Sequence, residues 1–189
     1  MERPLLAMIS RVEAQKGFDL LLTILDDLLG SDVSYVLLGS GQKDTEIRLR
    51  EIAERHADRA GIRVGYEEET PHLIEAGADI FLMPSRYEPC GLNQMYSMRY
   101  GTVPVVRATG GLADTVREFD PNTGEGTGFR FHDYNAHDFK DAIHRALGFW
   151  NDRDAWRKIM RNGMMTDFSW DRSAKLYMDV YDQVKAGTH

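Results

Sequence analysis

The sequence predicts an α/β fold, a doubly wound, Rossmann-like parallel sheet of about six strands followed by C-terminal helices. Short apolar runs of strand length alternate with longer segments whose apolar residues recur at helical spacing. Such an alternation requires parallel strand pairing with right-handed crossovers. The length of 189 residues suits one domain, and 42% hydrophobic with 28% charged residues is ordinary for a globular protein.

The first part of the chain predicts three strands and two helices. Residues 5–9 are apolar like a buried strand, and leucines then recur at helical spacing until Gly30, a favourable helix C-cap. A second strand, 35–38, runs into the turn Gly39-Ser40-Gly41. Residues 45–59 separate apolar from charged side chains as a helix with one solvated face does. Residues 62–66 predict a short third strand.

The second part of the chain continues the alternation. A helix over 70–76 begins at an N-cap with Pro71 in its first position, and strands follow at 80–83 and 103–106, with a helix over 91–100 between them. A short helix after Gly110-Gly111 and a glycine-rich loop precede an edge strand, 129–131. From residue 136 the chain is predicted to be helical, with breaks near 151–152 and 168–169.

Composition and charge exclude several classes of function. The formal charge of −7 argues against a nucleic-acid or anionic-membrane surface, since both need a basic face. No stretch approaches the roughly 20 apolar residues that span a bilayer, so we expect a cytoplasmic protein without a membrane partner. The six histidines and the single cysteine, Cys90, show no metal-ligand spacing, and we expect neither a metal nor a cofactor.

Every candidate functional residue follows a predicted strand. Ligands bind at the carboxyl ends of the strands in doubly wound sheets, so we expect one shared crevice. The candidates, in strand order, are Arg11 and Lys16, then Gly39, Ser40 and Gly41, then Tyr66, then Glu88, and finally Thr109, Gly110 and Gly111.

The residue types favour a bound anion beside a bound polar group. A helix beginning at Gly91 directs free N–H groups toward a phosphate, and Arg11 with Lys16 suits a diphosphate leaving group. Glu88 is placed to hydrogen-bond hydroxyl groups or to face a developing positive charge. The alternative is that both cations and Glu88 are solvated loop residues and that Tyr66 packs at a strand end.

A nicotinamide-dinucleotide site is not indicated by the Gly39-Ser40-Gly41 turn. Asp44 occupies the place of the third glycine in the fingerprint.

Three segments resemble the C-terminal, nucleotide-sugar-binding domain of the bacterial glycogen synthases and plant starch synthases. They read SRVEAQKGFDLL, SRYEPCGLNQMYSMRYGTVPVVRATGGLADTV and FSWDRSAKLYMDVY. The resemblance covers essentially the whole chain and implies one half of a glycosyltransferase-B fold. We accordingly divide the chain into a donor-binding domain, 1–168, and a last helix, 169–189, which packs on it or crosses toward an absent N-terminal domain.

The resemblance also implies roles for individual positions. Arg11 and Lys16 match the pair that neutralises the donor diphosphate, and Glu88 matches the acid that holds the glucose hydroxyls. The remaining substrate contacts are expected from Gly39, Ser40 and Gly41 at the nucleoside, Tyr66 on the adenine, Cys90 beside the sugar, Gly91, Leu92 and Asn93 at the phosphates, and Thr109 and Gly110.

Two positions depart from related patterns. Tyr96 stands where related glycosyltransferases carry a second glutamate. The synthase family that this chain resembles has its own variant of the pattern, and Tyr96 agrees with that variant. Asn93 stands where the bacterial enzymes often have threonine.

The implied reaction transfers glucose from ADP-glucose to the non-reducing end of an α-1,4-glucan, with retention and without a metal. ADP-glucose and ADP are the expected ligands, and the glucan acceptor would bind through the missing N-terminal domain. We therefore expect the chain to be part of a longer protein, inactive alone, from a bacterial cytoplasm or a plant plastid. The alternatives are a non-catalytic nucleotide- or glycan-binding module and a related glycosyltransferase that uses UDP-glucose.

Overall fold

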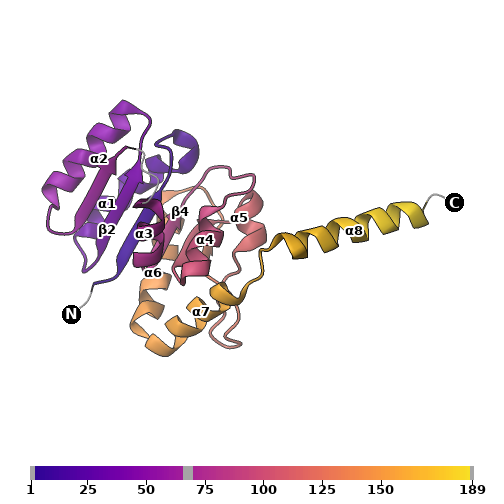
Figure 1. Ribbon diagram of the computed structural model, residues 1–189. Helices are drawn as coiled ribbons and strands as arrows, with labels where there is room; N and C mark the ends of the chain where they lie inside the picture. Colours follow the sequence, from indigo (N-terminus) through magenta and orange to yellow (C-terminus); the bar gives the residue numbers. More distant parts are fainter. Residues whose placement is uncertain (1–2, 66–69, 188–189) are drawn as a thin grey trace.

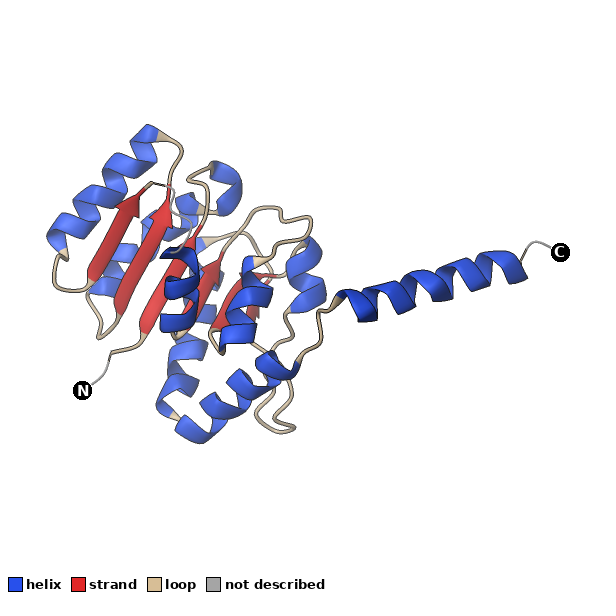
Figure 2. Ribbon diagram, in the orientation of Figure 1, coloured by secondary structure: helices blue, strands red, loops and turns tan. Residues whose placement is uncertain are grey.

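One six-stranded sheet forms the centre of the computed structural model, which describes residues 3–65 and 70–187. The strands are β1 (Leu5–Ile9), β2 (Ser34–Gly39), β3 (Ala60–Val64), β4 (Ile80–Met83), β5 (Val103–Arg107) and β6 (Phe129–Phe131). All pairings between these strands are parallel, and their order is β3-β2-β1-β4-β5-β6 (Figure 2). The predicted doubly wound fold is confirmed, including the edge position of residues 129–131.

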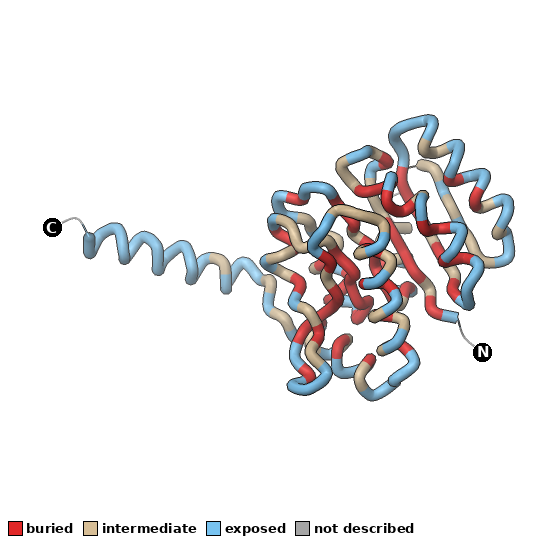
Figure 3. Tube along the Cα trace, turned by 180° about the vertical axis from the view of Figure 1, so that it is seen from behind, coloured by how far each residue is buried: buried red, intermediate tan, exposed pale blue. Residues whose placement is uncertain are grey.

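Helices cover both faces of the sheet. Successive strand residues point to opposite sides, so the apolar strands present side chains to be buried on each face. Leu6 and Met8 belong to a core formed with α1 (Phe18–Leu29), α2 (Lys43–Arg55) and α6 (Ala136–Asn151). The intervening Ala7 packs toward α3 (Thr70–Gly77), while Met98 and Leu112 bring α4 (Asn93–Tyr100) and α5 (Gly110–Thr115) onto the same face. Buried segments therefore concentrate along the strands (Figure 3).

The direction of winding reverses between β1 and β4. From β1 the chain proceeds outward to β2 and β3, and then returns through α3 to place β4 on the other side of β1. The loop after β1 leads to α1 on one face, whereas the loop after β4 leads to α4 on the other face (Figure 1). Loops that diverge in this way leave a crevice at the carboxyl ends of the two strands.

Three predicted elements have bounds that differ from the structure by two residues or more. The second helix spans Lys43–Arg55 rather than 45–59, because pairing with β2 already holds the Arg59 carbonyl, which accepts from the Tyr35 N–H at 2.8 Å. For the same reason β3 spans Ala60–Val64 rather than 62–66. The predicted strand residue Tyr66 lies outside the described residues. The fourth helix begins at Asn93 and not at Gly91, since Gly91 has a left-handed φ of +75°.

The C-terminal region consists of α6, α7 (Arg153–Met165) and α8 (Trp170–Ala186), with breaks where they were expected. Trp156 and Ile159 of α7 are buried in the core. Helix α8 has no buried residue and projects away from the body (Figure 1, Figure 3). No helix in the described part of the chain is both long and apolar enough to cross a membrane.

Candidate functional site

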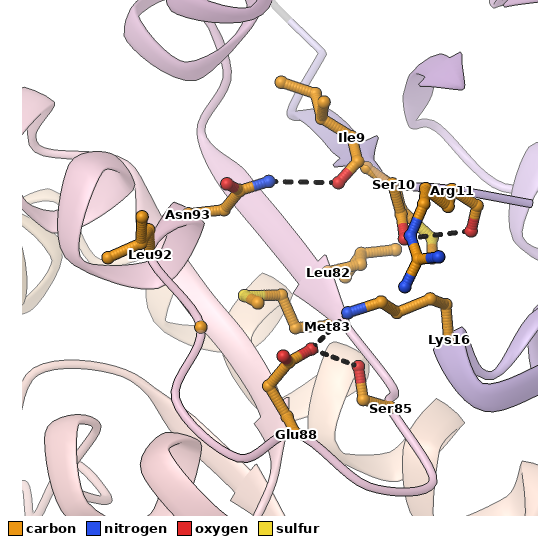
Figure 4. Close-up of a pocket in the computed structure, with 12 residues that line it drawn as sticks. Ile9, Ser10, Arg11, Lys16, Leu82, Met83, Ser85, Glu88, Leu92 and Asn93 are labelled. Atoms are coloured by element: carbon orange, nitrogen blue, oxygen red, sulfur yellow. Dashed lines mark hydrogen bonds and ion pairs between the residues drawn. The ribbon is translucent and has the colours of Figure 1, made fainter. Parts of the chain in front are cut away.

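A cavity of about 270 Å³ lies between the loops that follow β1 and β4 (Figure 4). It therefore occupies the point at which the winding of the sheet reverses. Six residues predicted from the sequence line it: Arg11, Lys16, Glu88, Gly91, Leu92 and Asn93. The two early cations, the acid and the head of α4 are thus brought together.

Lys16 and Glu88 form an ion pair inside this cavity. The Lys16 Nζ lies 2.6 Å from Glu88 Oε2, and the side chains are only 18% and 10% exposed. Ser85, which is buried, donates its hydroxyl to the same oxygen at 3.2 Å. The second oxygen, Oε1, has no hydrogen bond to any residue that the structure describes (Figure 4). One carboxylate oxygen is thus held by the protein, whereas the other has no partner among the described residues.

The loop after β1 is held against the loop after β4 by one backbone hydrogen bond and one from a side chain to a backbone carbonyl. The Arg86 N–H donates to the Gln15 carbonyl at 2.8 Å, and Gln15 Nε2 donates to the Tyr87 carbonyl at 2.9 Å. A short 3₁₀ turn, Ala14–Lys16, ends at Gly17 with φ +79°. A Cβ at Gly17 would lie 2.1 Å from the Pro84 carbonyl oxygen. Only glycine allows this approach, which brings Lys16 to Glu88.

Arg11 lies at the mouth of the cavity rather than within it. Its side chain is 68% exposed, and Nη1 pairs with Glu13 Oε1 at 2.9 Å. A solvated guanidinium of this kind can turn toward an incoming anion at little cost. Arg11 and Lys16 therefore line one cavity but differ in burial and in their present partners.

The head of α4 forms the opposite wall of the cavity. The first N–H groups of a helix have no hydrogen-bond acceptor within the helix, so they favour a bound anion. The Asn93 Nδ2 donates to the Ile9 carbonyl at 3.0 Å and thereby fastens α4 to the end of β1. The side-chain amide of Asn93 is therefore hydrogen-bonded within the protein. Its backbone N–H lies at the N-terminal end of α4.

The side chains of two polar residues at the site were not singled out from the sequence. Ser85 supports the Glu88 carboxylate, and buried Gln94 donates Nε2 to the Cys90 and Gly91 carbonyls at 3.2 and 3.0 Å. Both belong to the quoted segment of residues 85–116. A polar side chain directly after an apolar strand, three positions before the acid, was the available signal for Ser85.

Thr109 and Gly110 lie outside the lining of the cavity. The Gly111 N–H donates to the Glu88 carbonyl at 3.0 Å, and a Cβ at Gly110 would approach that carbonyl oxygen to 2.1 Å. This turn supports the Glu88 backbone. A direct ligand contact from Thr109 or Gly110 stays a prediction.

An adjoining cavity of about 210 Å³ lies on the β2 side and shares Ile9, Ser10, Arg11 and Asn93 with the first. Gly39 and Ser40 line it, whereas the Gly41 N–H donates to Glu46 Oε1 at 2.7 Å. Cys90 is exposed beside the Gly91 carbonyl, and Tyr66 lies outside the described residues. The two cavities together form an elongated site from Glu88 to Gly39.

Comparison with known proteins identifies a family. The family model described as "Glycosyl transferases group 1" matches residues 1–163. The chain is 51% identical over 182 residues to a glycogen synthase of Koribacter versatilis, covering 96% of this chain and 38% of that protein. It is 53% identical over 184 residues to a glycogen synthase of Desulfitobacterium hafniense, covering 97% of this chain and 39% of that protein.

Among solved structures, the chain is similar to the catalytic domain of starch synthase IV from Arabidopsis thaliana bound to ADP and acarbose. The TM-score is 0.86 at 34% identity, over 96% of this chain and 38% of that chain. A sucrose-phosphate synthase from Thermosynechococcus elongatus, with a TM-score of 0.72 at 22% identity over 99% of this chain and 47% of that chain, shares the fold. The sheet and its helices match one half of the glycosyltransferase-B fold. The chain spans less than two fifths of the length of the glycogen synthases it matches.

Proposed function

The chain belongs to the glycosyl transferases of group 1, and on that premise we propose that it is the donor-binding domain of a glycogen or starch synthase. The reaction is transfer of glucose from ADP-glucose to the non-reducing end of an α-1,4-glucan, with retention. The remainder of the longer protein supplies the acceptor site, so the chain alone binds the donor and transfers nothing. The cytoplasmic location stays a prediction of the sequence.

The observation that carries this proposal is the joining of Lys16, Glu88 and the head of α4 in one cavity. Lys16, with Arg11 at the mouth, supplies positive charge for the diphosphate, and the helix head adds backbone N–H groups. The Glu88 Oε1 is the acceptor for glucose hydroxyls. The adjoining cavity beside Gly39 and Ser40 accommodates the nucleoside, which gives the order sugar, diphosphate, nucleoside.

Catalysis on this proposal is electrostatic. Negative charge develops on the departing ADP, and preorganised donors that face it stabilise the transition state more than the ground state. Lys16 and the α4 head act on the diphosphate, while Glu88 orients the hexose and faces its developing positive charge. No side chain of the described cavity is assigned as a nucleophile.

ADP is the proposed nucleotide because the related starch synthase structure contains ADP. Titration of the chain with ADP by calorimetry tests this assignment directly. We expect binding, weakened about tenfold to a hundredfold by Lys16→Ala and less by Arg11→Ala, because a partly buried charge-assisted contact contributes more than an exposed one.

Lys158→Ala is the matched control, since Lys158 contacts the Thr123 carbonyl at 3.4 Å and lines neither cavity. Absence of ADP and ADP-glucose binding at millimolar ligand would remove the proposal. Tighter binding of UDP than ADP would instead support a related UDP-glucose enzyme. Binding of maltooligosaccharide without any nucleotide would indicate a glycan-binding module.

A further inference from the structure

The partner of Lys16 is unexpected for a residue proposed to bind a diphosphate. Its ammonium lies 2.6 Å from Glu88 Oε2, in a pair whose side chains are 18% and 10% exposed. Water screens such a pair less than a surface pair, so it resists separation. An anion that approaches Lys16 also approaches the Glu88 carboxylate, which repels it.

Hydrogen bonds hold both the side chain and the backbone of Glu88. The buried Ser85 hydroxyl donates to Oε2, the oxygen that Lys16 also contacts. The Gly111 N–H holds the Glu88 carbonyl at 3.0 Å. Lys16, by contrast, has a long side chain with three donors and can redirect them.

We propose that Lys16 exchanges between two partners, Glu88 when no donor is bound and the donor diphosphate when it is, so that Glu88 disfavours a nucleotide without glucose. This inference rests on the proposed function. When ADP-glucose binds, sugar hydroxyls donate to the Glu88 carboxylate and take over the role of the ammonium. Lys16 is thereby released to the diphosphate, and the two contacts support each other.

The same exchange provides a route for product release. After glucose has been transferred, the carboxylate no longer has sugar hydroxyls as donors. Glu88 then recaptures Lys16, and ADP loses its most buried cationic contact. The ion pair thus discriminates the intact sugar nucleotide from the spent one.

A Glu88→Gln substitution tests the exchange, because the exchange predicts a gain in ADP affinity where general damage to the site predicts a loss. Calorimetric titration of the chain should show ADP bound roughly threefold to tenfold more tightly than by the unaltered chain, because Lys16 is freed. ADP-glucose should gain less or bind more weakly, since the amide is a poorer acceptor for sugar hydroxyls. The ratio of the two affinities should therefore shift toward ADP. General damage to the site would weaken both ligands.

A double-mutant cycle separates the exchange from simple charge repulsion. In a Lys16→Met background, Glu88→Gln should change ADP affinity less than about twofold. The second control is Glu13→Gln, which neutralises another carboxylate of the same region, one paired with exposed Arg11. Glu13→Gln should give a smaller gain in ADP affinity than Glu88→Gln. This comparison replaces the cycle if circular dichroism shows that the Lys16→Met chain does not fold.

The outcomes distinguish the two proposals. Failure of the unaltered chain to bind either ligand removes the proposed function. ADP binding that is unchanged or weakened by Glu88→Gln overturns the exchange but leaves the donor site in place. An equal gain from Glu88→Gln with and without Lys16, or from Glu13→Gln, also overturns the exchange.

Discussion

Gly17 is the residue on which the shape of the site depends most directly. Its φ is +79°, and an added Cβ would lie 2.1 Å from the Pro84 carbonyl oxygen. Gly17→Ala should lower the free energy of unfolding by about 2–4 kcal/mol, because a left-handed backbone and a backbone clash both add cost. Urea unfolding followed by circular dichroism measures this change. ADP affinity should fall as well, since relief of the clash moves Lys16 away from Glu88.

Gly148→Ala is the matched control for the same substitution elsewhere. Gly148 lies within α6, and an added Cβ there would meet no atom within 4 Å. Alanine should stabilise this helix by up to about 1 kcal/mol. If both substitutions have the same effect on stability, the left-handed backbone and the close approach to Pro84 do not make glycine necessary at position 17.

Single residues also mark the limit of what the sequence could predict. Arg11, Lys16 and Glu88 follow predicted strands, so their convergence at one edge of the sheet was foreseeable. The ion pair was not, because Lys16 and Glu88 are 72 positions apart and meet only when β4 lies beside β1. Local pattern carries no information on that strand order. Ser85 did carry a local signal, but its hydrogen bond to Glu88 depends on the orientation of that side chain, which the local pattern does not give.

At the scale of elements, α3 carries a buried carboxyl group that predicts a pH dependence of stability. Glu75 is 2% exposed, and burial raises its pKa, opposed in part by His72 at 3.3 Å. A raised pKa means that the folded chain binds the proton more tightly than the unfolded chain. The contribution to stability is complete below the unfolded pKa of about 4.3 and is lost as pH rises through the folded pKa.

Glu75→Gln removes this titration while retaining a polar side chain. The variant should be more stable than the unaltered chain near pH 7, and the difference should shrink as pH falls toward about 4.3. Urea midpoints measured at several pH values test this. A difference that grows on acidification would show that the ion pair with His72 outweighs burial.

The bounds of α2, α4 and β3 were predicted less well than those of the other strands, and the structure gives the reason. Apolar runs such as 80–83 are buried on both sides, so the pattern alone locates them. The end of α2 is set by pairing of β3 with β2, and the start of α4 by the backbone of Gly91. Both are tertiary effects, and neither leaves a periodic signal in the sequence.

At the scale of the whole molecule, the body and α8 behave as separate parts. Large apolar residues along α8 are exposed, among them Trp170 at 83% and Val184 at 65%. Helix α7, in contrast, contributes buried Trp156 and Ile159 to the core. The stability of the body should therefore depend on α7 and be independent of α8.

Truncation after Ser169 tests this separation. Because α8 buries no residue of its own against the body, the truncated chain should unfold at nearly the same urea concentration and bind ADP equally. It should also self-associate less in size-exclusion chromatography with light scattering, since a large exposed apolar surface promotes association. Truncation after Asn151 is the contrasting control, because loss of Trp156 and Ile159 should cost several kcal/mol or prevent folding. A strong destabilisation by the first truncation would instead mean that α8 packs on the body in solution.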